Sequence, residues 1–224
     1  MKILITTLLL FSSSCLFAFE DQMFLKGGIS YSTASIVAQQ GTEDDMKGLG
    51  FNTHFGYKWT DYELSLSSYT YWGNIEGLTF AANGEQISGN GSFRHVSFGP
   101  VFKYHYSNWQ PYKSWTFFTG FGPVWSLQTV KMEEFTSTGS SYNSNQKLTF
   151  ESFGGLLVFG IEEQLKHKEA HPAFIEVIYS YKKSHKLAVV DASDFTETNI
   201  LSKQEGEQEL SGHFLMISVG ITIF

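Results

Sequence analysis

The sequence predicts an all-β protein, an eight-stranded antiparallel transmembrane β-barrel that is preceded by a cleaved signal peptide. Three observations predict it: segments in which apolar and polar residues alternate with a period of two, connections that alternate in length, and a short apolar run near the amino terminus. Successive side chains of a strand point to opposite faces of a sheet, so a period of two indicates strands. We therefore divide the chain into a signal peptide, residues 1–18, and a barrel, residues 19–224.

The first eighteen residues have the pattern of a secretory signal peptide. Lys2 precedes an apolar run from Ile3 to Phe11, and a stretch rich in small residues leads to the expected cleavage point after Ala18. Cys15 is the only cysteine, so the mature chain would contain no disulfide and no cysteine-based metal site. An alternative interpretation makes Cys15 a lipoprotein processing site, although the leucine expected three residues earlier is missing.

The clearest hairpin lies at residues 49–72. In residues 49–59 one face is apolar and aromatic, whereas the other face carries Gly50, Asn52, His54, Gly56 and Lys58. A tight connection at Thr60-Asp61 follows, and residues 62–72 resume the alternation. Each segment has about eleven residues, enough for a tilted transmembrane strand of roughly nine to eleven. We expect the apolar face to meet lipid and the polar face to line the barrel interior.

Six further segments complete the set of eight strands: residues 23–31, 93–106, 115–128, 148–161, 173–182 and 212–224. The connections over residues 32–48, 73–92, 129–147 and 183–210 are long and polar, and those over residues 60–61, 107–114 and 162–172 are shorter. Short periplasmic turns and long extracellular loops are typical of bacterial outer-membrane barrels, and an even strand number returns both termini to the periplasm. The sequence therefore predicts a location in the outer membrane.

Tryptophan and tyrosine gather near the short turns. The residues that we expect to form an aromatic girdle there are Trp59, Tyr62, Tyr104, Trp109, Tyr112 and Trp115. Amphipathic rings prefer the headgroup level of a membrane. Tyr69, Tyr71, Trp72 and Trp125 lie toward the long connections and are expected at the opposite interface. A soluble β-sandwich is the alternative, because its strands would also alternate, but the signal peptide and the asymmetry of the connections count against it.

The polar faces of the strands supply charged and titratable side chains to the predicted lumen. These residues are His54, Lys58, Glu63, His95, Lys103, His105, Glu176 and Lys182. An eight-stranded barrel is just wide enough for side chains to fill it, and an unpaired buried charge is costly. We expect a packed polar network rather than an open pore, with no cofactor and no metal.

Two segments resemble those of the small eight-stranded outer-membrane barrels of the OmpA, OmpX and OmpW kind. They are the closing strand from His213 to Phe224 and the Pro111-Tyr112 turn that leads into residues 118–122. The resemblance implies that the terminal Phe224 is an assembly signal for the barrel-assembly machinery. This sequence departs from the family in one respect: the apolar residues from Leu215 to Ile223 alternate out of phase with Phe224. Outer-membrane lipids, lipopolysaccharide and the assembly machinery are the expected partners.

A structural or surface-interaction role through the extracellular loops is the function that we expect. Residues 32–48 and 183–210 are acidic and could bind divalent cations or a partner surface, or could remain solvated. The formal charge of −7 argues against nucleic acid. A narrow channel for small apolar solutes is an alternative, because the predicted inner face also carries Phe118, Val124, Leu156, Val158, Phe174 and Ile178.

We expect no enzymatic activity, although a second alternative is a lipid A-modifying enzyme. The segment His105-Tyr-Ser-Asn108 looks like the His-x-Ser-Asn segment of lipid A deacylases, which implies Ser107 as the nucleophile and His105 as its base. The predicted topology places this segment at a periplasmic turn, whereas the site of that family faces the outer leaflet. His95 and Ser97 share one face of a strand, and His167 and His171 have a helical metal-ligand spacing that Pro172 interrupts.

Overall fold

The computed structural model describes residues 23–37, 43–82, 85–110, 114–137, 146–164, 171–191, 197–199 and 211–223. The signal peptide predicted for residues 1–18, with Cys15, lies outside these residues, as do Tyr112, His167 and Phe224. In the described part of the chain, no helix is long and apolar enough to cross a membrane.

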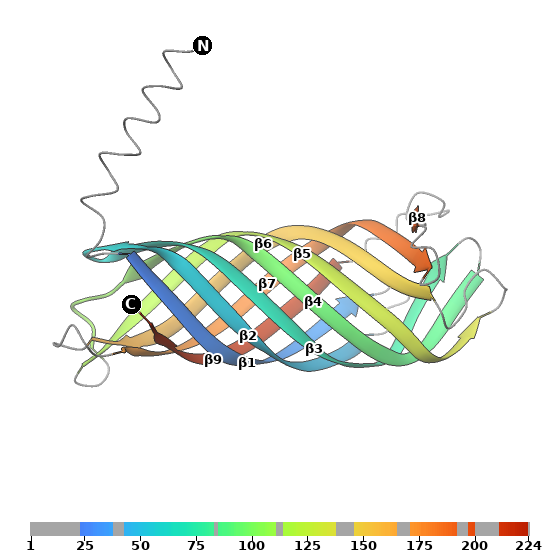
Figure 1. Ribbon diagram of the computed structural model, residues 1–224, viewed down its shortest axis with the longest axis horizontal. Coiled ribbons are helices and arrows are strands. Elements are labelled where there is room, and N and C mark those ends of the chain that lie inside the picture. Colours follow the sequence, from blue (N-terminus) through green and yellow to red (C-terminus); the bar gives the residue numbers. More distant parts are fainter. Residues whose placement is uncertain are drawn as a thin grey trace, which may run out of the picture.

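The described residues form nine strands, and eight of them close into a ring (Figure 1). The ring strands are β1 (Met23–Val37), β2 (Glu43–Trp59), β3 (Tyr62–Ala82), β4 (Glu85–His105), β5 (Trp115–Ser137), β6 (Gln146–Glu163), β7 (Ala173–Asp191) and β9 (Ser211–Thr222). Each pairs with its neighbour in an antiparallel ladder, and β1 pairs with β9 to close the ring. The predicted all-β barrel is therefore confirmed. The short β8 (Glu197–Asn199) pairs with β7 beside the ring.

The two ends of the barrel differ. We call one the turn end, because it holds the Thr60-Asp61 turn, the start of β1 and the end of β9. The other, the loop end, holds the connections between β1 and β2, β3 and β4, β5 and β6, and β7 and β9. In Figure 1 the turn end lies on the left and the loop end, with β8, on the right. Both described chain ends lie at the turn end, as an even strand number requires.

The strands are longer than the alternation predicted, and the prediction was wrong at their loop ends. The predicted connections over residues 32–48, 73–92 and 129–147 are in large part strand: β3 has 21 residues, β4 has 21 and β5 has 23. A tilted strand needs only about nine to eleven residues to cross the hydrocarbon core. The barrel wall therefore continues past the length that a membrane covers.

The outer surface of the barrel is apolar along the turn-end part of the strands. Large apolar side chains are exposed on every ring strand, among them Ile29, Leu49, Leu66, Phe98, Phe121, Leu157, Val177 and Val219. Soluble monomers rarely expose a continuous apolar surface of this kind. We call this surface the apolar belt, and it is the lipid-facing surface of a transmembrane barrel.

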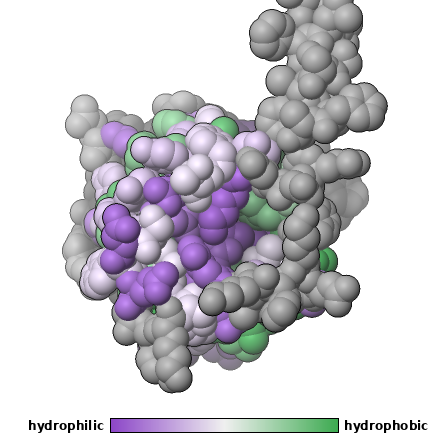
Figure 2. Space-filling view, turned by 90° about the vertical axis from the view of Figure 1, so that its left-hand side faces the viewer, coloured by the Kyte–Doolittle hydropathy of each residue, from purple (hydrophilic) through white to green (hydrophobic). Residues whose placement is uncertain are grey.

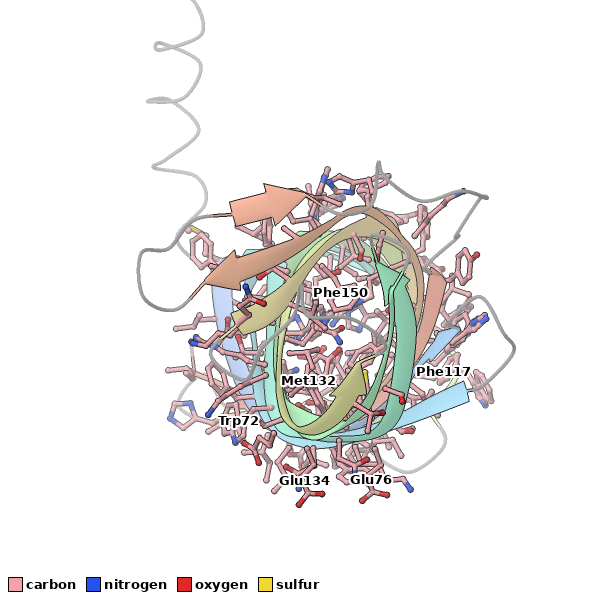
Figure 3. All side chains as sticks on the ribbon, turned by 90° about the vertical axis from the view of Figure 1, so that its right-hand side faces the viewer. Trp72, Glu76, Phe117, Met132, Glu134 and Phe150 are labelled. Atoms are coloured by element: carbon pink, nitrogen blue, oxygen red, sulfur yellow. The ribbon has the colours of Figure 1, made fainter. Side chains whose placement is uncertain are left out.

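The exterior becomes polar toward the loop end, over a surface that we call the polar collar. Its exposed residues include Lys47, Asn74, Glu76, Asn90, Arg94, Lys131, Glu133, Glu134, Lys183 and His185. Figure 3 looks into the loop end, with Glu76 and Glu134 pointing away from the ring and Met132 and Phe150 pointing into it. Outside the apolar belt, the wall thus has a polar outside and an apolar inside, as a barrel in water would.

The Thr60-Asp61 turn joins β2 to β3, with Trp59 paired to Tyr62. Thr60 has a φ of 53°, which a β-branched residue adopts at a cost because its Cβ crowds the backbone. Two-residue hairpins with positive φ at the first turn position normally place glycine there.

We expect Thr60→Gly to raise the free energy of unfolding by about 1 kcal/mol, because glycine removes the left-handed strain. Urea unfolding in lipid vesicles, followed by tryptophan fluorescence, measures this change. Asp61→Gly is the matched control, since Asp61 does not have a positive φ and a glycine there only adds chain entropy to the unfolded state. An equal stabilisation by both variants would contradict the assignment of strain to Thr60.

Candidate functional site: the barrel lumen

The turn-end half of the lumen holds a cluster of charged side chains. Its members, which we call the ionic cluster, are Lys26, His54, Lys58, Glu63, Lys103, His105, Glu162 and Glu176. They point inward because each lies in phase with the polar residues of its strand. Figure 2 shows the turn end, where hydrophilic residues occupy the middle of the described surface.

Glu63 is the centre of one half of the cluster. Its Oε2 accepts from Lys26 Nζ at 2.7 Å and lies 3.2 Å from His105 Nε2. Its Oε1 lies 3.5 Å from Lys103 Nζ. The Glu63 side chain has no solvent exposure, so these partners replace the water that a carboxylate would otherwise bind. Hydrogen-bonded cations of this kind are what makes a buried carboxylate tolerable.

Glu162 lies beside Glu63 and shares a cation with it. Lys26 Nζ is 2.9 Å from Glu162 Oε1, so a single ammonium bridges both carboxylates. Lys58 Nζ contacts Glu162 Oε2 at 3.3 Å, and its side chain is 29% exposed, the most open of the cluster's lysines. Lys58 therefore lies where the cluster meets solvent at the turn end.

Glu176 anchors the deeper half of the cluster. Its carboxylate accepts from Lys103 Nζ at 3.1 Å and from Asn52 Nδ2 at 2.9 Å, and it lies 3.0 Å from His54 Nε2. Ser218 Oγ donates to Asn52 Oδ1 at 3.0 Å, which orients the amide. Three lysines face three glutamates in the cluster, so its formal charges balance while the histidines are neutral.

Ser67, His54 and Glu176 form a serine-histidine-glutamate arrangement. His54 Nδ1 lies 2.8 Å from Ser67 Oγ, and its other ring nitrogen faces Glu176. A nucleophile, a base and an orienting acid have this connectivity in hydrolases. Here Ser67, His54 and Glu176 are all without solvent exposure. The arrangement orients the imidazole and satisfies its two nitrogens.

Two phenylalanine rings cover the cluster inside the lumen. Lys103 Nζ lies 4.8 Å from the centroid of the Phe118 ring, a cation–π contact. The Phe174 ring packs edge-on against the His54 ring, with centroids 5.9 Å apart. Each ring faces a glycine of a neighbouring strand: a Cβ at Gly160 would lie 2.5 Å from Phe118 Cζ, and one at Gly220 would lie 2.5 Å from Phe174 Cζ. The glycines thus leave the space that the rings fill.

Three atoms of the cluster could in principle ligate a cation. Ligand atoms of Glu63, His105 and Glu162 lie within 4.8 Å of one another. The ammonium of Lys26 already contacts both carboxylates, at 2.7 Å and 2.9 Å. A divalent ion would add charge to a set that is already balanced, so the geometry favours an ion-pair cluster over a metal centre.

A second polar group lies deeper toward the loop end and is separate from the ionic cluster. Lys182 Nζ lies 2.8 Å from His95 Nε2, and His95 Nδ1 lies 3.3 Å from Gln128 Oε1. Tyr71 stacks on His95 with ring centroids 4.4 Å apart and on Phe214 at 4.6 Å. We call His95, Lys182, Gln128, Tyr71 and Phe214 the His95 group.

The predicted lumen set omitted three residues that complete the pairing: the cluster members Lys26 and Glu162, and Asn52, which contacts the cluster. Glu162 was placed in the turn over residues 162–172, but β6 runs to Glu163 and turns this carboxylate inward. Lys26 and Asn52 lie on the polar faces of their strands, and this alternation was the available signal for both. The structure places the predicted His54, Glu63, His95, Lys103, His105, Glu176 and Lys182 in the interior, divided between the two polar groups.

The predicted girdle residues lie around the turn end. Trp59, Tyr62 and Trp109 are exposed, and Tyr104 and Trp115 are half-buried. Their rings are neighbours around the barrel: the ring centroids of Trp59 and Tyr62 are 6.3 Å apart, and those of Tyr62 and Tyr104 are 5.3 Å apart. Such a row is what the headgroup level of a membrane favours.

The prediction for the opposite interface was wrong for two of its four residues. Tyr69 and Tyr71 are 1% exposed and point into the lumen, whereas Trp72 and Trp125 are exposed on the outside. Tyr69 and Tyr71 share the phase of Glu63 and Ser67 on β3, which is the inner phase. The alternation of side chains along β3 decides the direction of these two tyrosines, and the general preference of tyrosine for membrane interfaces does not.

The remaining sequence motifs are dispersed. His105 points into the lumen toward Glu63, while Ser107 is exposed in the turn that follows β4. His95 and Ser97 are both buried on the inner face of β4. His171 is exposed at the turn end, and its Nδ1 lies 3.1 Å from the carbonyl oxygen of Thr222.

The closed ring and the apolar belt define the class of the protein, an eight-stranded transmembrane β-barrel with the architecture of outer-membrane proteins. No family model and no curated protein matches the chain. Among solved structures, the outer membrane protein OprG from Pseudomonas aeruginosa is similar, with a TM-score of 0.50 and 14% identity over 90% of this chain and 95% of that one.

Two further solved structures are similar over most of their length. Neisserial surface protein A has a TM-score of 0.48 and 14% identity, covering 89% of this chain and 96% of that one. Ail, the attachment invasion locus protein of Yersinia pestis, has a TM-score of 0.41 and 13% identity, covering 90% and 98%. At these identities the likeness concerns the fold.

We expect Lys103→Met to lower the free energy of unfolding by about 3–5 kcal/mol, because it leaves Glu63 and Glu176 short of a cation in a buried site. Urea unfolding in lipid vesicles measures the loss. Lys182→Met is the matched control: it removes a buried lysine that has no carboxylate partner among the described residues, so stability should stay equal or rise. Equal losses in both variants would show that carboxylate pairing does not decide the stability.

Proposed function

We propose that the protein is a closed barrel of the outer membrane that presents its loop end to partners at the cell surface, without conducting solutes. The polar collar is the observation that carries the proposal. On β5 the exposed side chains change from Trp125 and Leu127 to Lys131 and Glu133. A paired, regular wall that continues past the apolar belt gives the connections at the loop end a rigid support.

The edge between the belt and the collar suits the headgroups of lipopolysaccharide. In the ladder of β4 and β5, Arg94 is opposite Thr129 and Ser92 is opposite Lys131. Arg94 on β4 and Lys131 on β5 are therefore diagonal neighbours on the outer face. Trp72 lies beside Arg94 on the other side. Cations directly above an apolar surface match lipid phosphates above acyl chains. Lipopolysaccharide is therefore the first partner that we propose for the collar.

The lumen supports a non-conducting barrel. The ionic cluster and the rings of Phe118 and Phe174 fill the turn-end half, and Glu63, Lys103 and Glu176 are at most 1% exposed. An eight-stranded barrel is just wide enough for its side chains to fill it, or to hold one small ligand, and leaves no continuous water-filled path. A channel for small apolar solutes would have to pass a layer of paired charges, which apolar solutes do not solvate.

We also propose a non-enzymatic role. The exposed Ser107 lies at the turn end, away from the collar, and His105 is held in the lumen by Glu63. The separation leaves Ser107 without the base that a serine nucleophile needs within hydrogen-bond reach.

Cysteine labelling in intact cells tests the topology and the collar. Cys15 is the only cysteine and lies in the predicted signal peptide, so single substitutions report alone. We expect a membrane-impermeant maleimide to label Asn74→Cys and Glu133→Cys in the collar, and not Leu66→Cys or Phe98→Cys in the belt, because lipid covers the belt.

Two controls accompany this labelling experiment. Ser107→Cys at the turn end should react only after the outer membrane is permeabilised, and all five variants should react after denaturation. Labelling of Ser107→Cys in intact cells would reverse the proposed orientation. Labelling of the belt positions would remove the membrane assignment of the apolar surface.

Planar-bilayer recording tests the closed lumen. We expect the purified protein to give no discrete conductance steps, because the paired charges fill the barrel. A porin reconstituted in the same way shows that the bilayers report channels. Reproducible single-channel steps from this protein would contradict the closed barrel and favour the channel alternative.

A further inference from the structure

Lys182 has an environment that no other described lysine of the lumen shares. Lys26 and Lys103 each contact two carboxylates, and Lys58 contacts one. Lys182 is 7% exposed, and the described residues bring no carboxylate to its ammonium. Its contacts are His95 Nε2 at 2.8 Å and the ring of Phe214 at 5.0 Å.

The neighbours of Lys182 cannot neutralise its charge. An ammonium only donates, so His95 Nε2 accepts the hydrogen bond and the imidazole is neutral, with its Nδ1–H directed to Gln128 Oε1 at 3.3 Å. The ring of Phe214 offers a cation–π contact, which supplies less than an anion would. A buried cation without an anion is costly, and at least one further donor of the ammonium is unused among the described residues.

The wall around Lys182 has little side-chain cover. Its two cross-strand neighbours are Gly154 on β6 and Gly212 on β9, so neither adjacent position contributes a side chain beside the ammonium. Tyr71 from β3 stacks on both His95 and Phe214, and the His95 and Phe214 rings lie 5.8 Å apart, so the three rings form one aromatic cluster. The Lys182 backbone thus lies between two glycines, and its ammonium lies next to the aromatic cluster.

The lumen between Lys182 and the loop end is apolar except for the part-buried Ser152 and Ser184, whose hydroxyls hydrogen-bond to each other. Its buried residues are Met46, Ile75, Phe93, Val130, Met132, Leu148 and Phe150. Figure 3 shows Met132 and Phe150 pointing into the ring from this end. Met46 and Met132 are flexible side chains that repack easily around an apolar guest. Below Lys182, Val101, Val158 and Ile178 separate it from the ionic cluster.

We propose that the loop-end half of the lumen binds an apolar monocarboxylate, whose carboxylate pairs with Lys182 and whose apolar part packs among the residues around Met46, Met132 and Phe150. The charge of the headgroup matches the unpaired ammonium, and the apolar part matches the lining above it. The ionic cluster closes the lumen below, so the molecule enters and leaves through the loop end. This is a binding activity in addition to the surface role proposed above.

Equilibrium dialysis of radiolabelled octanoate against the protein in zwitterionic nanodiscs tests the proposal, with the uptake by empty nanodiscs subtracted. We expect saturable binding of one octanoate per barrel, and binding of 1-octanol, which has the same tail without a charge, that is roughly tenfold weaker. Acetate, which has the charge without the tail, should not bind measurably.

Variants separate the ion pair from simple partitioning into the apolar lining. Lys182→Met should weaken octanoate binding by roughly tenfold or more and leave 1-octanol binding unchanged, since only the charged contact is removed. Lys183→Met is the matched control, because Lys183 is the next residue and is exposed on the outside; it should bind octanoate as the wild type does.

Three results would overturn the proposal. They are equal binding of octanoate and 1-octanol by the wild type, binding of octanoate that survives in a folded Lys182→Met variant, and absence of saturable octanoate binding. Heat-dependent migration in gels shows whether each variant is folded. The comparison of octanoate with 1-octanol uses only the wild-type protein, so it tests the role of the carboxylate even if a variant does not fold.

Discussion

In the turn-end half of this barrel, each buried charge pairs with a partner on another strand, because the lumen is too narrow for bulk water. The ionic cluster meets this constraint with contributions from six of the eight ring strands: Lys26 from β1, Lys58 from β2, Glu63 from β3, Lys103 from β4, Glu162 from β6 and Glu176 from β7. Backbone ladders connect neighbouring strands only. The ion pairs connect strands across the ring, and they fix the cross-section of the turn-end half.

The second constraint is the change of solvent along each strand. Within the apolar belt, the outside is apolar and the inside is polar, as in the pair Leu66 and Ser67. In the collar the same strands are polar outside and apolar inside, as in Glu76 and Ile75. The period remains two, but its polarity inverts at the level of Trp72, Arg94 and Lys131. The loop-end lumen consequently resembles the interior of a water-soluble barrel, and the His95 group lies near this inversion.

This inversion explains which parts of the fold could be predicted from the sequence. The number of strands, their order and the inward or outward direction of residues 49–72 follow from period two and the lengths of the connections. The loop-end extensions could not be found by searching for an apolar outer face, since that face is polar there. Residues 73–92 therefore looked like a polar connection, although Ile75 keeps the inner phase.

The candidate site was predictable as a set of residues and not as a set of pairs. Alternation alone turns Glu63, Lys103 and Glu176 inward. It does not indicate that Lys103 bridges Glu63 to Glu176, because that contact depends on the curvature of the ring and the stagger of strands far apart in the chain. Nor does it separate Lys182, which has no carboxylate partner among the described residues, from the lysines that have one.

Lys26 lies on the strand that closes the ring, and its ammonium contacts carboxylates that come from opposite arcs, Glu63 on β3 and Glu162 on β6. While β1 and β9 are apart, the sheet has an open edge and that bridge is incomplete, so charged groups would face hydrocarbon without compensation. An open, incomplete sheet is therefore unfavourable in the hydrocarbon core of the bilayer. Insertion and ring closure have to advance together, with the charges enclosed as the wall curls around them.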